Sequence, residues 1–207
     1  MIVTISREYG AAGLAVADGV AQALDFELLT DDVPKAVAAR LGTSPDEVDA
    51  RASNQPSFTE RLLDGLGVGT PELVSPAAPR LPDDFDESVR REIERTIVER
   101  AARGRVVILG RNAGAVLRER RDVVRVFLTA PLEWRLARIV ESFGNTRAQA
   151  LADIERIDAK RKKFARERYK IGWGEAGSYD LAVDVSRFGI QGTVALVVRA
   201  TREVQPL

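Results

Sequence analysis

Three short polar segments follow apolar runs in this sequence, and their residue types suit phosphate chemistry. They span Ser6 to Gly13, Gly110 to Gly114 and Thr129 to Pro131. Arginine occurs in the first two segments and recurs further along the chain. Guanidinium groups donate paired hydrogen bonds to phosphate oxygens, and glycine lets a backbone come close to a ligand. These segments are therefore candidates for binding a phosphorylated molecule.

The first segment is a small-residue loop between a strand pattern and a helix pattern. Gly10, Ala11, Ala12 and Gly13 leave its backbone open to a ligand. The N-terminus of the following helix favours an anion, because its amides lack partners within the helix. The P-loop consensus GxxxxGK[ST] is absent, since neither the Lys nor the hydroxyl residue follows Gly13. A donor-phosphate site and a plain strand-to-helix turn both remain open from these residues.

Composition excludes many other kinds of site. The 207 residues contain 31 Lys and Arg, 31 Asp and Glu, and neither His nor Cys. Thiolate nucleophiles, disulfides, zinc ribbons and Ser–His–Asp triads are therefore excluded, and acid–base chemistry falls to carboxylates, Lys, Arg or Tyr. The zero net charge gives no general attraction to nucleic acid. Because the sequence has neither a signal-peptide pattern nor an apolar run long enough to span a bilayer, we expect a cytoplasmic protein without membrane contact.

Strand and helix patterns alternate along the chain. Apolar runs predict strands at 2–5, 26–29, 106–109, 123–128 and 179–185. Helical spacing predicts helices at 14–24, 34–41, 45–52, 84–103, 132–143, 146–168 and 191–204, with another beginning near 114. This order predicts one domain over 1–207, an α/β/α sandwich around a parallel sheet. Ligands bind at the carboxyl ends of such strands, where the three polar segments lie.

The first segment resembles the opening of the cytidylate kinase-like family, a branch of the P-loop nucleoside monophosphate kinases. Later segments are similar to that family in the same order: Leu109–Ala113, Phe127–Arg135, Asp158–Arg161 with Tyr169, and Tyr179–Leu181. The likeness covers nearly the whole chain apart from about 65–85. Residues 65–83 are rich in Gly and Pro and lack helical or strand periodicity, which predicts a mobile loop. The resemblance implies that 30–85 is an acceptor-side helical insertion containing this loop, and that 132–175 is a lid-like helical segment.

The resemblance implies transfer of a phosphoryl group from ATP, with Mg²⁺, to a nucleoside monophosphate such as CMP or a related small acceptor. Such transfer needs positive charge and positioning more than covalent chemistry, so a chain without His could perform it. Arg7 and the backbone of Gly10, Ala11, Ala12 and Gly13 would cradle the donor phosphates. Arg111 would contact the phosphate or base of the acceptor. Arg135 and Arg161 would contact the transferred phosphate, and Asp158 would bind a sugar hydroxyl.

Each implied role has a plainer alternative. Arg111 could pair with a local carboxylate, and Arg135 and Arg138, which share a helix face, could simply be solvated. Asp158 and Arg161 are three residues apart and could form an ordinary ion pair within a helix. No residue is assigned to a metal.

Two other functions remain open. The family's loop carries Ser and Gly where this chain has Ala11 and Ala12, and Arg where it has Leu14. The loss of the loop cation and hydroxyl fits a pseudokinase that serves as a binding or regulatory module. Arg156–Lys170 contains eight basic and two acidic residues, which could serve a lid or, less favoured, a nucleic-acid surface. The oligomeric state is not indicated.

Overall fold

The computed structural model describes residues 1–30, 32–45, 48 and 83–204, and these contain a five-stranded sheet. Its order is β2-β3-β1-β4-β5, and every neighbouring pair is parallel. The strands are β1 (Ile2–Arg7), β2 (Glu27–Leu29), β3 (Val106–Leu109), β4 (Val123–Thr129) and β5 (Leu181–Asp184). The predicted parallel α/β fold is confirmed. β1 is central, so the loop that follows it opens at the middle of the sheet's carboxyl edge.

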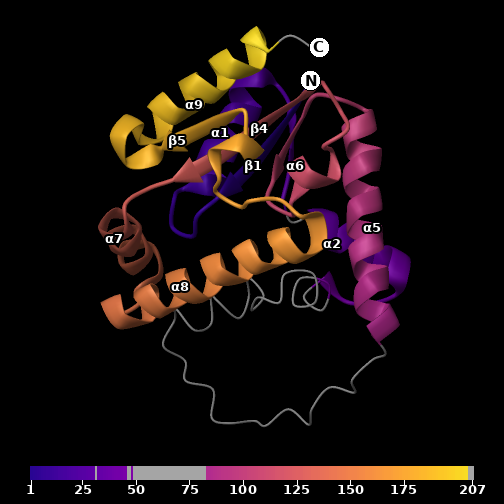
Figure 1. The fold of residues 1–207 in the computed structure, drawn as a ribbon, viewed down its shortest axis with the longest axis horizontal. Coiled ribbons are helices and arrows are strands. Elements are labelled where there is room, and N and C mark those ends of the chain that lie inside the picture. Colours follow the sequence, from indigo (N-terminus) through magenta and orange to yellow (C-terminus); the bar gives the residue numbers. More distant parts are fainter. Residues whose placement is uncertain (31, 46–47, 49–82, 205–207) are drawn as a thin grey trace.

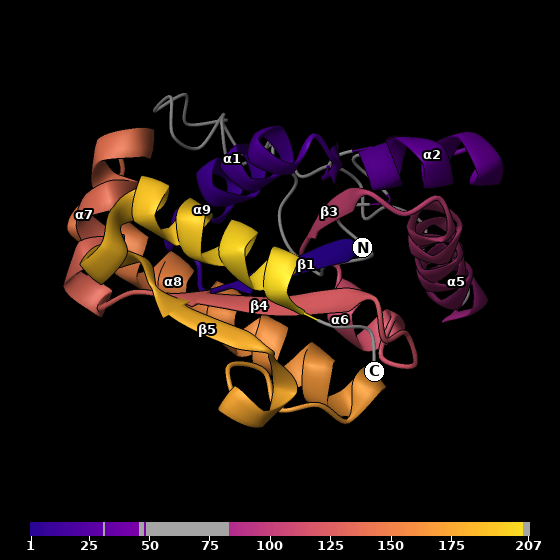
Figure 2. The same cartoon turned by 90° about the horizontal axis from the view of Figure 1, so that it is seen from above.

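Helices connect the strands and cover both faces of the sheet (Figures 1 and 2). They are α1 (Gly13–Leu24), α2 (Asp32–Leu41), α5 (Asp83–Ala102), α6 (Ala113–Val116), α7 (Leu132–Phe143), α8 (Arg147–Phe164) and α9 (Val185–Glu203). A π-helical turn, Ala165–Tyr169, extends α8, and a 3₁₀ turn spans Ala176–Ser178. Most of the predicted helix at 45–52 and of the predicted loop at 65–83 lies outside the described residues. Within the described part, no helix combines the length and apolarity needed to cross a bilayer.

The strands are buried on both sides, which explains their continuous apolar sequences. On one face, Val3 and Ile5 of β1 pack in a cluster with α1 and α9. On the other face, Ile2 packs in a second cluster with residues of α2 and α5. Figure 2 shows α1 and α9 together on one side of the sheet. A third cluster joins α7 to α8 through residues such as Leu136 and Ile154.

The start of α9 differs from the sequence-based expectation, whereas the start of α8 agrees with it. α9 begins at Val185, six residues before the predicted start, because the Asp184 carboxylate caps the amide of Ser186 at 2.9 Å. Gly189, with φ 65° and ψ 174°, interrupts the helical backbone, so only the part after it follows the regular helical pattern. α8 starts with a capping box between Thr146 and Gln149.

The π-helical turn after α8 is fastened to α5. The Tyr169 hydroxyl donates to Glu94 Oε1 at 2.8 Å, and Arg168 Nη2 lies 2.9 Å from Glu87 Oε1. Burial, reinforced by the hydrogen bond to Glu94, raises the pKa of Tyr169 above its ordinary value of 10.0. These contacts hold the end of the predicted lid segment against the long helix.

Replacing Tyr169 by Phe should therefore lower the free energy of unfolding by about 1 kcal/mol at neutral pH. The protonated Tyr169 hydroxyl makes its full contribution to stability at pH values below the pKa of tyrosine in the unfolded chain. That contribution is lost as the pH rises from there toward the higher pKa of the folded state. The stability difference between wild type and variant should thus narrow above about pH 10. Urea denaturation of both proteins at several pH values tests this. A constant difference over that range would contradict a buried, hydrogen-bonded phenol.

Candidate phosphate-binding site

A cavity of about 600 Å³ lies beside the N-terminus of α1, at the carboxyl end of β1. The loop after β1 and the first turns of α1 form one wall. The other walls come from α7 and α8, which run past the same end of the sheet in Figure 1. Besides residues of the loop, the lining includes Leu14, Ala15, Asp18, Leu28, Arg138, Ile139, Ser142, Phe143 and Arg161.

The main chain of the loop turns through left-handed backbone beside this cavity. Ala12 precedes α1 in the left-handed region with φ 55°, and no side chain caps the helix there. Gly10 has φ 83°, and a Cβ at that position would lie 3.0 Å from Ile139 Cδ1 and 3.1 Å from Arg135 O. Glycine therefore allows both the turn and the close packing of α7. Helix amides left without a side-chain cap are natural donors to an anion.

Three guanidinium groups border the cavity. The side chain of Arg7 runs between two glycines, since a Cβ on Gly13 would lie 2.7 Å from Arg7 Cγ, and a Cβ on Gly110 would collide with its guanidinium. Arg138 stacks over the ring of Trp134 with its Cζ 5.0 Å from the centroid, and Arg161 reaches in from α8. These groups give the cavity the positive charge that phosphate oxygens require.

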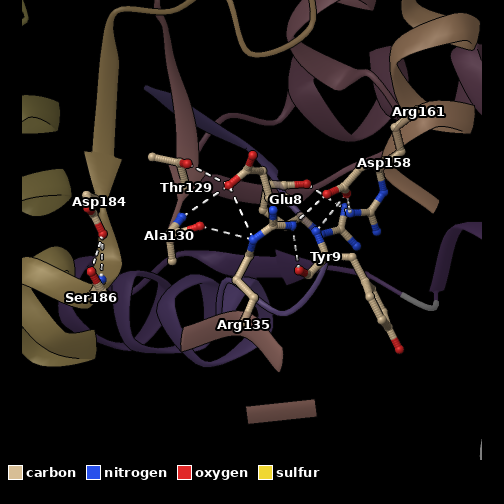
Figure 3. Close-up of polar contacts among 10 residues, drawn as sticks. Glu8, Tyr9, Thr129, Ala130, Arg135, Asp158, Arg161, Asp184 and Ser186 are labelled. Atoms are coloured by element: carbon tan, nitrogen blue, oxygen red, sulfur yellow. Dashed lines mark hydrogen bonds and ion pairs between the residues drawn. The ribbon is translucent and has the colours of Figure 1, made fainter. Parts of the chain in front are cut away.

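Arg135 lies behind the loop, where it is held between two carboxylates (Figure 3). Its Nη1 donates to Asp158 Oδ2 at 2.6 Å and to Tyr9 O at 3.2 Å, and its Nε donates to Ala130 O at 3.0 Å. Glu8 Oε2 lies 3.6 Å from that Nε. The residue is only 8% exposed. The guanidinium thus joins the loop, the end of β4 and α8.

Glu8 and Asp158 complete this buried network. Glu8 Oε2 accepts from the Thr129 hydroxyl at 2.6 Å and from the Ala130 amide at 3.1 Å. Asp158 Oδ1 accepts from the Tyr9 amide at 2.9 Å, while Arg161 Nη1 is 3.7 Å away. Burial raises the pKa of the Asp158 carboxyl, and the Tyr9 amide and Arg135 act against that rise. The ion pair with Arg161 exists, but the shorter contacts run to the loop and to α7.

Arg111 lies after β3 and is not among the described residues that line the cavity. It sits in a strained turn, where Gly110, Arg111 and Asn112 have φ values of 78°, 55° and 50°. Consecutive left-handed residues other than glycine are costly and tend to occur at functional sites. The structure brings Arg7, Arg161, Gly10, Ala12 and Gly13 together around the cavity, with Arg135 and Asp158 directly behind them. Ala11 is buried, and its amide donates to the Glu8 carbonyl at 3.3 Å. Arg111 is not part of the described lining of the cavity, although the preceding Gly110 lies against the guanidinium of Arg7.

Two parts of this region, Glu8 and the end of α7, have no role in the sequence-based prediction. Glu8 was grouped with the polar residues after β1 but was given no role, although it joins the loop to β4. Ser142 and Phe143 were not considered, yet they line the cavity. Ser142 is four residues after Arg138, so helical spacing from the candidate arginines of α7 could have identified it.

The donor set fits a polyphosphate better than a protein-held metal. The first turn of α1 offers Leu14 and Ala15 where P-loop proteins place a cation and a hydroxyl. Among the described residues, no group of three or more His, Cys, Asp or Glu side chains could hold a metal ion. The first turn of α1 therefore lacks the hydroxyl with which P-loop proteins hold Mg²⁺, and a Mg²⁺ ion here would be held mainly by the phosphates of a bound nucleotide.

Comparison with known sequences settles the family. The model of the cytidylate kinase-like family matches residues 2–187. The chain belongs to this family. A cytidylate kinase of Haloarcula marismortui is 24% identical over 209 residues, covering 100% of this chain and 92% of that protein. A cytidylate kinase of Ignicoccus hospitalis is 30% identical over 155 residues, covering 74% of this chain and 85% of that protein.

Solved structures agree on the fold of this cytidylate kinase-like chain. An uncharacterised protein from Eubacterium ventriosum superposes with a TM-score of 0.70 at 17% identity, covering 98% of this chain and 99% of the other. A shikimate kinase from Bacteroides thetaiotaomicron gives a TM-score of 0.53 at 13% identity and covers 98% of each chain. The fold is therefore that of the P-loop kinases, as the sequence resemblance implied.

Proposed function

We propose that this member of the cytidylate kinase-like family transfers the γ-phosphoryl group of ATP to a nucleoside monophosphate such as CMP, or to a related small acceptor. One observation carries the proposal. A single cavity combines the N-terminus of α1, which no side chain caps, with the guanidinium groups of Arg7, Arg138 and Arg161. Phosphoryl transfer depends on positioning and on stabilising the charge of the transferred group, and this arrangement supplies both.

The residues divide into donor and acceptor roles. Arg7 and the loop amides that border the cavity, those of Gly10, Ala12 and Gly13, hold the donor phosphates. Arg161 neutralises charge on the transferred group, which its place on the cavity wall supports. Arg111 orients the acceptor, and the strained turn around it supports a functional role. ATP is the donor, and Mg²⁺ would be held mainly by its phosphates, because α1 lacks the hydroxyl that binds this ion in P-loop proteins.

A catalytically inactive nucleotide-binding module is the second candidate. Leu14 occupies the position of the P-loop lysine, and 59% of its surface is exposed beside the cavity. An apolar side chain there cannot stabilise the developing charge on a transferred phosphoryl group. This candidate keeps phosphate binding and loses turnover.

Calorimetric titration with ATP, with and without Mg²⁺ and CMP, tests the proposal together with an assay for CDP formation. We expect micromolar ATP affinity that tightens when CMP is present, and measurable turnover. Nucleotide binding without turnover of any nucleoside monophosphate would favour the inactive module. Absence of ATP binding at millimolar concentration would overturn both candidates.

An RNA-associated role through the basic segment Arg156–Lys170 has less support than the two candidates above. Arg156 pairs with Asp153 at 2.6 Å, Arg161 donates to the carbonyl of Arg7, and Arg168 pairs with Glu87. Lys163 and Lys170 also contact Glu167, so at least five of the eight cations of this segment are engaged within the protein. RNA binding would show an affinity that falls steeply with salt, and a salt-independent signal would contradict it.

The cytoplasmic location stays a prediction.

A further inference from the structure

We propose that Asp158 of α8 is a positioning residue which, together with Arg161, holds the main chain of the loop after β1 in its phosphate-binding shape. For Arg161 this role is additional to its proposed contact with the transferred phosphate. The loop is then ordered for phosphate only while α8 is docked against it. The link to phosphate rests on the proposed function, whereas the link between α8 and the loop rests on geometry alone.

Two side chains on one face of α8 bind the main chain of the loop. Asp158 Oδ1 accepts from the Tyr9 amide at 2.9 Å, and Arg161 Nη1 donates to the Arg7 carbonyl at 2.9 Å. The two side chains are three residues apart, about one helical turn, and so lie on the same face. Their main-chain partners are two residues apart. Figure 3 shows both side chains meeting the loop from the same element.

Both main-chain groups of Tyr9 are hydrogen-bonded to side chains. Its amide donates to Asp158, and its carbonyl accepts from Arg135 Nη1 at 3.2 Å. Arg135 in turn donates to the second carboxylate oxygen of Asp158 at 2.6 Å. Tyr9 immediately precedes Gly10, whose φ of 83° turns the chain toward α1. Fixing Tyr9 therefore fixes the start of the turn that leads to the α1 amides.

We call the two hydrogen bonds from Asp158 and Arg161 to the loop main chain the clamp. The clamp is shielded from water, so solvent cannot readily replace these hydrogen bonds when they are lost. The side chains of Asp158 and Arg161 are 17% and 14% exposed. If α8 moves away, the Tyr9 amide and the Arg7 carbonyl lose their α8 partners together. Docking of α8 and ordering of the loop are consequently linked equilibria. A ligand that binds the ordered loop must also favour the docked helix.

Hydrogen–deuterium exchange of the nucleotide-free protein tests the clamp. Asp158→Ala should raise amide exchange in residues 8–15 by about tenfold, with β3 and β4 unchanged. Asp158→Asn should rescue part of this protection, because its amide oxygen can still accept from the Tyr9 amide. Asp153→Asn is the matched control, since Asp153 pairs with Arg156 on the same helix at 2.6 Å, and it should leave exchange in the loop unchanged.

The outcomes separate the clamp from the proposed function. Unchanged loop exchange in Asp158→Ala, or a rise spread equally over the sheet, would overturn the clamp. If Asp158→Ala does not fold, Arg161→Ala and Arg161→Lys take its place, with rescue expected from Lys because it keeps a donor for the Arg7 carbonyl. ATP titration of the wild type decides the proposed function independently. If ATP binds, Asp158→Ala should weaken its affinity about tenfold and Asp158→Asn should restore part of it; an unchanged affinity would overturn the link to phosphate.

Discussion

Replacing Arg135 by Ala is expected to lower the free energy of unfolding by about 3–5 kcal/mol, the range typical of removing one partner from a buried ion pair. The substitution leaves the carboxylates of Glu8 and Asp158 without the cation that lies between them. It also removes the donor from the carbonyls of Tyr9 and Ala130. Because Arg135 is 8% exposed, water cannot readily take its place. Urea denaturation followed by circular dichroism measures the effect.

Arg138→Ala is the matched control for stability. Arg138 is one turn further along α7 and stacks over Trp134 without belonging to the buried network. Its loss should cost about 1 kcal/mol or less. A similarly small cost for Arg135→Ala would show that solvent reaches the network and that its ion pairs contribute little.

Replacing Gly13 by Ala is expected to weaken ATP binding by about tenfold or more, which corresponds to at least about 1.4 kcal/mol. Gly13 is the first residue of α1, and a Cβ there would lie 2.7 Å from Cγ of Arg7. The Arg7 stem would have to shift, and its guanidinium would leave the place it holds between Gly13 and Gly110. Alanine is otherwise favoured over glycine in a helix, so backbone propensity does not predict a loss of stability. Calorimetric titration with ATP measures the change.

Gly19→Ala provides the control on the same helix. A Cβ on Gly19 would lie 2.7 Å from Val194 Cγ2, where α1 packs against α9. Both substitutions add a methyl group to a glycine of α1 at 2.7 Å from a neighbouring side chain, but Gly19 is remote from Arg7. It should lower thermal stability and leave ATP affinity unchanged in the folded protein. ATP affinity equal to wild type in Gly13→Ala would remove Arg7 from the phosphate site.

The amino-acid sequence was sufficient for the fold and for the position of the loop. Continuous apolar runs such as Val106–Leu109 indicated strands covered on both faces, and all four of these residues are buried. Strand and helix patterns in alternation then left few possible topologies. Small residues after the first strand marked the loop, because close approach to a backbone requires small side chains. Local composition carries all of these signals.

The partners of the charged side chains were decided only by the tertiary structure. Spacing in sequence left an ion pair between Asp158 and Arg161 as one alternative, since helix residues three apart are neighbours on one face. The shorter contacts of Asp158 are with the Tyr9 amide, 149 residues away, and with Arg135 on another helix. Arg161 likewise donates to Arg7, 154 residues away. Such pairings depend on how α7 and α8 dock at the end of β1. A helix pattern determines which residues share a face, but the packing of the whole chain determines what that face meets.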